Sequence, residues 1–191
     1  MCSAFRNRFA TLPNARVTQS RFEDLEPHDC FVTAGNSFGL MTAGIDAAVV
    51  RYFGESLMQS VQHCILDRFL GEQPVGTAFI VPTGHRTIPF LTHAPTMRVP
   101  GSIEGSDKVY AATWAAILAV HAHNLEAEHK IQVIALPAMG TGFGGVPFDE
   151  AARQMAAAYR HYLELPTRLD WDFVVQRHKT ICYDGDRQVA R

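Results

Sequence analysis

The sequence has few cysteines, and none of them forms a Cys-x-x-Cys pair. The four are Cys2, Cys30, Cys64 and Cys182. A chain that is 47% apolar can build a core without disulfide bonds, so we expect reduced thiols. Histidine is abundant, but His121 and His123 stand two apart on a predicted helix and therefore face different directions. We expect neither a metal site nor a cofactor.

The sequence also lacks a long apolar run and a concentration of positive charge. Charged and polar residues interrupt every apolar run well before the roughly 18 consecutive apolar residues that a transmembrane helix needs. The N-terminal stretch has no apolar segment followed by a small-residue cleavage site, so we expect a cytoplasmic protein with no membrane partner. With 17 basic and 19 acidic residues and no Lys/Arg stripe, the charge does not indicate nucleic acid as a partner.

No internal repeat and no Pro/Ser-rich linker divides the chain, so we expect residues 1–191 to be one domain. Short β-rich runs alternate with longer helical patterns, which predicts an α/β fold. The strand candidates are 15–20, 29–35, 76–84, 89–96, 130–138 and 170–176. Helical spacing predicts helices over 44–70 with a break at Gly54, over 109–126 and over 147–163. The run 130–138 is apolar without alternation, which favours a central strand with helices on both faces.

Four glycines lie between that strand candidate and the last of these helices: Gly140, Gly142, Gly144 and Gly145. A strand, a glycine loop and a helix in this order leave backbone N–H groups and the positive helix end free for a phosphate. A tight turn is the alternative, but it requires fewer glycines. The loop lacks the Lys-Ser/Thr ending of a Walker loop, which excludes an NTPase on this loop. The Gly-x-Gly-x-x-Gly spacing fits a dinucleotide site, but the next strand candidate is followed by Arg177 instead of an acid, which argues against a dehydrogenase.

A second strand, loop and helix pattern covers residues 31–50, and two such loops from one sheet can form the walls of one cleft. Its segments VTAGNS and AGIDAAV resemble the first loop of macro domains, which bind ADP-ribose. The segment LPAMGTGFGGVP is similar to that family's diphosphate loop, and THAPT stands between them in the expected order. The resemblance covers residues 15–165 and implies a three-layer α/β/α sandwich with a central mixed sheet.

The resemblance also implies roles for individual residues. Asn36 and Asp46 fall at the two positions that are associated with catalysis in hydrolytic members of the family. Asn36 would bind the distal ribose, and Asp46 would orient or deprotonate the attacking water. Phe143 falls where a side chain packs on that ribose, and Val17 where a side chain contacts adenine. The full set of expected ligand-binding residues is Val17, Ala34, Asn36, Gly44, Ile45, Asp46, Ala138, Gly140, Thr141, Gly142, Phe143 and Gly144.

Several residues depart from the family pattern. Arg16 stands where an Asp usually recognises adenine, and either Asp24 or Glu26 could replace that contact. Thr33 replaces an asparagine. Residues 42–43 are Thr-Ala where the family has glycines.

Three functions stay open on this basis. The first is hydrolysis of ADP-ribose from a modified side chain, a nucleic acid or O-acetyl-ADP-ribose, the second is reading of ADP-ribose without turnover, and the third is a structural or assembly role. His93 is a candidate extra base, with a histidine bonded to the backbone as the alternative. The modified substrate is expected to meet the loop 97–110.

Overall fold

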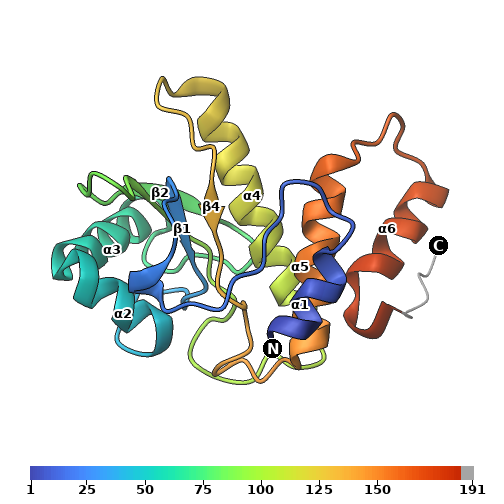
Figure 1. Ribbon diagram of the computed structural model, residues 1–191, viewed down its shortest axis with the longest axis horizontal. Coiled ribbons are helices and arrows are strands. Elements are labelled where there is room, and N and C mark those ends of the chain that lie inside the picture. The colour runs from blue at the N-terminus through green and yellow to red at the C-terminus, as the bar shows by residue number, and fades with distance from the viewer. Residues whose placement is uncertain (186–191) are drawn as a thin grey trace.

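The computed structural model describes residues 1–185, and a four-stranded mixed sheet with helices on both faces forms its centre (Figure 1). In spatial order the strands are β2 (Phe79–Pro82), β3 (Phe90–His93), β1 (Cys30–Thr33) and β4 (Ile134–Ala135). β1 is parallel to both β3 and β4, whereas β2 is antiparallel to β3 at one edge. The carboxyl ends of β1, β3 and β4 therefore meet at one edge of the sheet.

The two faces of the sheet carry different helices. α2 (Gly44–Phe53) and α3 (Glu55–Phe69) pack on the face that carries Phe31 and Leu91. α4 (Lys108–Glu126) and α5 (Phe148–Leu163) cover the face that carries Val32, and α1 (Cys2–Phe9) and α6 (Trp171–Ile181) pack against α5. Two short 3-10 turns, η1 (Phe22–Asp24) and η2 (Tyr183–Gly185), complete the described chain. The expected α/β/α sandwich with a mixed sheet is confirmed.

The helix predictions agree closely with the structure. The pattern over 44–70 divides into α2 and α3 at Gly54, whose φ of 94° is readily adopted only by glycine. α1 was not predicted from the sequence.

Two strand predictions are wrong, and a third is too long. Residues 15–20 form no regular structure. Residues 170–176 begin α6, because the side chain of Asp170 accepts a hydrogen bond from Phe173 N at 2.9 Å and so caps a helix. Only two residues of 130–138 are a strand. Just before it, the N–H groups of Gln132 and Val133 donate to Asp29 Oδ2 at 2.7 and 2.8 Å.

Three loops leave the carboxyl ends of the parallel strands, and they lie together below the sheet in Figure 1. They are residues 34–43 after β1, 94–107 after β3 and 136–147 after β4. Ser37 N donates to Met97 O at 3.0 Å, and Ile103 N donates to Gly144 O at 2.9 Å. The loop 94–107 thus connects the other two. No described helix has the length and apolarity needed to cross a membrane.

Candidate functional site

Asn36 organises the first of these loops with its side-chain amide. Its Oδ1 accepts hydrogen bonds from Phe38 N and Leu40 N at 3.1 and 3.3 Å, and its Nδ2 donates to Leu40 O at 2.9 Å. The side chain is buried, with 9% of the residue exposed. The Asn36 side chain therefore stabilises the conformation of its own loop, and one hydrogen of its Nδ2 group remains available to another partner.

Asp46 lies in the first turn of α2, next to free backbone donors. The N–H groups of Gly44, Ile45 and Asp46 have no acceptor inside the helix, and Ala43 at the N-cap provides no side-chain oxygen. The Asp46 carboxyl does not cap its own helix. It is directed inward with the residue 7% exposed, and burial raises its pKa to about 7.

His93 ends β3 beside this carboxyl. It is fully buried, and its Nδ1 lies 2.6 Å from Oε1 of Gln73. The partner is thus a side chain and not the backbone, which corrects the alternative drawn from the sequence. Burial lowers the pKa of His93 to about 4, so the ring is neutral at neutral pH. A Cβ on Gly35 would contact His93 Nε2 at 2.8 Å and Asp46 Oδ2 at 3.0 Å, so the two polar groups are gathered against one bare glycine.

The glycine loop separates into positions that packing requires and positions that are open. A Cβ on Gly140 would lie 2.5 Å from Val109 Cγ2, and one on Gly144 would lie 2.3 Å from Gly140 O. Gly140 also has a φ of 74°. At Gly142, in contrast, a Cβ would meet nothing within 4 Å. Tight packing therefore accounts for two of the glycines without any ligand.

The outer part of the same loop is exposed. Phe143 is 63% exposed, and among residues 1–185 the N–H groups of Gly142 and Phe143 have no acceptor. Thr141 Oγ1 donates to Ala138 O at 2.8 Å and fixes the start of the loop. The exposed N–H groups and the aromatic ring together form a surface that can receive an anion joined to a sugar.

The remaining expected residues lie around this edge of the sheet. Val17, Ala34 and Ala138 all pack against the core cluster that contains Val32. Arg16 forms an exposed ion pair with Glu26, one of the two residues expected to replace the adenine contact. Asp24 lines a hollow of about 600 Å³, and Gly44 and Ile45 line the same hollow.

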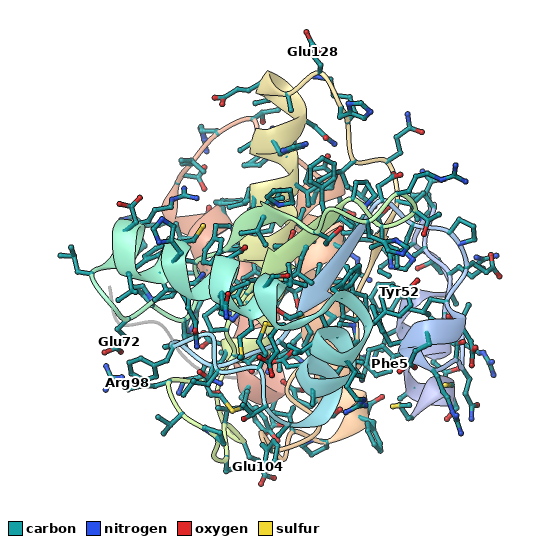
Figure 2. The ribbon with its side chains drawn as sticks, turned by 90° about the vertical axis from the view of Figure 1, so that its left-hand side faces the viewer. Phe5, Tyr52, Glu72, Arg98, Glu104 and Glu128 are labelled. Atoms are coloured by element: carbon teal, nitrogen blue, oxygen red, sulfur yellow. The ribbon has the colours of Figure 1, made fainter. Side chains whose placement is uncertain are left out.

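Figure 2 shows the α3 side of the molecule, where Arg98 of the loop 94–107 meets Glu72. Their side chains form an exposed ion pair at 2.6 Å. This pair anchors the start of the loop to the turn after α3.

Gln73 and Gly35 are the site residues that the sequence did not single out. Gln73 stands 20 positions before its partner His93 in a turn without any motif, so only the fold reveals their contact. Gly35 lies inside the recognised segment, but nothing in the sequence says what it touches. Within the described part of the chain, no group of three or more His, Cys, Asp or Glu side chains could hold a metal ion, and the four cysteines are free.

Comparisons with known proteins point to one family. The model of the Macro domain family matches residues 32–155. An uncharacterized protein of Aquifex aeolicus is 33% identical over 135 residues, which are 70% of this chain and 74% of that protein. A protein of Cupriavidus necator described as macro domain-containing is 27% identical over 158 residues, with 83% and 84% covered. The chain spans 62% of a further relative, from Aeropyrum pernix.

Solved structures give the same result for the fold. The Oceanobacillus iheyensis macrodomain with MES bound has a TM-score of 0.61 and 22% identity over 72% of this chain and 71% of that chain. The structure of that macrodomain with ADP has a TM-score of 0.59 at 22% identity, covering 70% of this chain and 68% of that chain. A variant of it has been solved with ADPR.

Proposed function

The chain belongs to the macro domain family, and from this premise we propose that it binds ADP-ribose where its 34–43 and 136–147 loops meet, and hydrolyses an ADP-ribosyl bond there. The bond would join the distal ribose to a modified side chain, to a nucleic acid or to an acetyl group. The Oceanobacillus iheyensis structures with ADP and with ADPR support the binding half of this proposal.

One observation carries the proposal: two sets of free backbone N–H groups follow neighbouring parallel strands. Gly44, Ile45 and Asp46 provide the first set at the start of α2, after β1. Gly142 and Phe143 provide the second set, after β4. A diphosphate carries two negative charges and has oxygens on both sides, so donors from two loops and a positive helix end suit it.

The hydrolytic half of the proposal rests on Asp46. Hydrolysis breaks the bond between ribose C1 and the departing oxygen, and a water molecule supplies the new oxygen at C1. A carboxyl group whose pKa is raised to about 7 is partly protonated and partly ionised near neutral pH. It can orient this water, and the ionised fraction can accept the water's proton. Asn36 would donate a hydrogen bond to the ribose with its remaining Nδ2 hydrogen. The direction of this donor is fixed because the loop around it is preorganised.

A reader that binds ADP-ribose without turnover is the second candidate, and a specific observation favours it. Three hydrogen bonds within the loop occupy the amide of Asn36, and Asp46 is 7% exposed. A carboxyl so deeply buried has little access to the bulk water that hydrolysis consumes. Binding is common to both candidates, whereas turnover separates them.

Isothermal titration with ADP-ribose, with AMP and NAD as comparison ligands, tests the binding proposal. We expect micromolar or tighter affinity that is selective for ADP-ribose. No heat and no thermal shift would contradict the proposal and favour a structural role. Incubation with O-acetyl-ADP-ribose and with an ADP-ribosylated protein, followed by mass spectrometry of released ADP-ribose, then separates a hydrolase from a reader.

A further inference from the structure

The contacts of His93 determine which ring nitrogen carries its hydrogen. The amide nitrogen of Gln73 lies 3.2 Å from Thr77 O and 3.4 Å from His93 O. Both partners are acceptors only, so this end of Gln73 must be the donating Nε2, and the other end is Oε1. Oε1 therefore accepts the hydrogen bond from His93 Nδ1 at 2.6 Å. In the neutral ring, Nε2 is left with a lone pair.

This lone pair and the Asp46 carboxyl lie against the same glycine, Gly35, although no hydrogen bond or ion pair joins them directly. The nearest atoms to a Cβ built on Gly35 are His93 Nε2 and Asp46 Oδ2, at 2.8 and 3.0 Å. Within the described chain, His93 Nε2 and Asp46 Oδ1 are buried without a hydrogen-bond partner. An ionised carboxylate and a lone pair would repel each other and leave both groups unsatisfied. One proton, shared through a bridging water molecule, satisfies both.

We propose that Asp46 and His93 hold one proton between them, and that ADP-ribose binds together with this proton. The inference rests on the proposed ADP-ribose site. Asp46 lies in the first turn of α2, whose free N–H groups are the proposed partners of the diphosphate. An ionised carboxylate at that position would oppose the anion, whereas the protonated group leaves the positive helix end to the ligand.

On the α2 side, the charged residues Arg21, Glu23, Asp24 and Arg51 line the hollow at Gly44 and Ile45, but none of them contributes to the pKa shift of Asp46. The uncharged side chains facing the pair from β1, the turn after α3 and β2 are Thr33, Gln73 and Phe79. Arg68 of α3 is exposed and lies over the Phe79 ring, 5.9 Å from its centroid. Burial is the single cause of both shifts: it raises the pKa of Asp46 to about 7 and lowers the pKa of His93 to about 4. Burial therefore favours the protonated form of the carboxyl and the neutral form of the ring.

Titration calorimetry measures the coupling directly. ADP-ribose is titrated near neutral pH in two buffers of different ionisation enthalpy, because the diphosphate diester itself does not ionise there. We expect net proton uptake on binding, and an affinity that falls about five- to tenfold as the pH rises from about 6 to about 8 through the deprotonation of the pair. Asp46→Asn should bind without proton uptake and with a flat pH profile. Asp67→Asn, an exposed change on α3, is the matched control and should keep the uptake.

Two further variants test the role of His93 as a positioning residue. His93→Leu removes the acceptor, and Gln73→Leu lets His93 move its hydrogen to Nε2 and donate to an ionised carboxylate. Both should shift the midpoint of the affinity profile to lower pH by about one unit, while a merely structural role would change affinity equally at every pH. His161→Leu is the control, since burial also lowers the pKa of His161 to about 4, but in α5.

Nitrogen NMR of the histidine rings provides a test without ligand. The His93 signal, identified by its loss in His93→Leu, should show hydrogen on Nδ1. Hydrogen on Nε2 would overturn the inference, as would ADP-ribose binding without proton uptake, which leaves the proposed function intact. No ADP-ribose binding at any pH would overturn the proposed function and the coupling together.

Discussion

Gly142 and Gly144 stand two positions apart, yet alanine should have very different effects on stability at the two sites. A methyl group on Gly144 would lie 2.3 Å from Gly140 O and 2.9 Å from Ile103 Cγ1. A backbone oxygen cannot rotate away, so the loop must shift and disturb the hydrogen bond from Ile103 N to Gly144 O. Overpacking costs about 1–3 kcal/mol and the weakened hydrogen bond about 1 kcal/mol. We expect Gly144→Ala to lower the free energy of unfolding by about 2–4 kcal/mol.

Gly142→Ala is the control, because its methyl group meets nothing within 4 Å and the residue is exposed. Its unfolding free energy should stay within about 0.5 kcal/mol of the wild type. In a domain of this size, 1 kcal/mol corresponds to about 2–4 °C, so thermal melts should separate the two variants by about 4–16 °C. Equal melting temperatures would refute the assignment of Gly144 to packing against the loop 94–107.

Three other substitutions address the proposed ligand site and the loop around it. Gly142→Glu should keep the melting temperature but lower ADP-ribose affinity at least about tenfold in calorimetry, since it places negative charge at the exposed N–H groups; unchanged affinity would remove this loop from the site. Asn36→Ala should lower the unfolding free energy by about 1–3 kcal/mol in urea titrations, because Phe38 N and Leu40 N lose their acceptor; an unaffected midpoint would mean that water replaces the amide. Asp46→Asn should gain about 3 kcal/mol of stability over the wild type between about pH 4 and about pH 7, because the buried acid ionises more readily when unfolded; a pH-independent difference would contradict the raised pKa.

The sequence predicted the helical layers better than the sheet. Helical spacing located α2, α3, α4 and α5, because apolar residues at this spacing form one face of a helix, which packs on the sheet. Residues 15–20 and 170–176 contain the alternation of a strand, but an N-cap at Asp170 starts a helix, and the first segment finds no neighbouring strand. Strand pairing depends on partners distant in the chain, which a local pattern does not contain.

For the candidate site, the sequence indicated the loops but not their internal contacts. The motifs identified Asn36, Asp46 and the glycine loop, and the structure shows that these segments follow the neighbouring parallel strands β1 and β4. The sequence could not reveal that packing requires glycine at positions 140 and 144, nor that Gln73 orients His93. These facts depend on distances between segments that only the folded chain brings together.

The hydrogen bond between Ile103 and Gly144 has a consequence for protein engineering. A designer who wished to change substrate preference would naturally transplant the loop 94–107 from another family member. Ile103 also packs against Gly140 and Gly144, in the space that side chains at these positions would fill. A transplanted loop with a different residue at position 103 would not match this glycine loop and would displace its backbone N–H donors. The smallest exchangeable unit in this protein is therefore the two loops together.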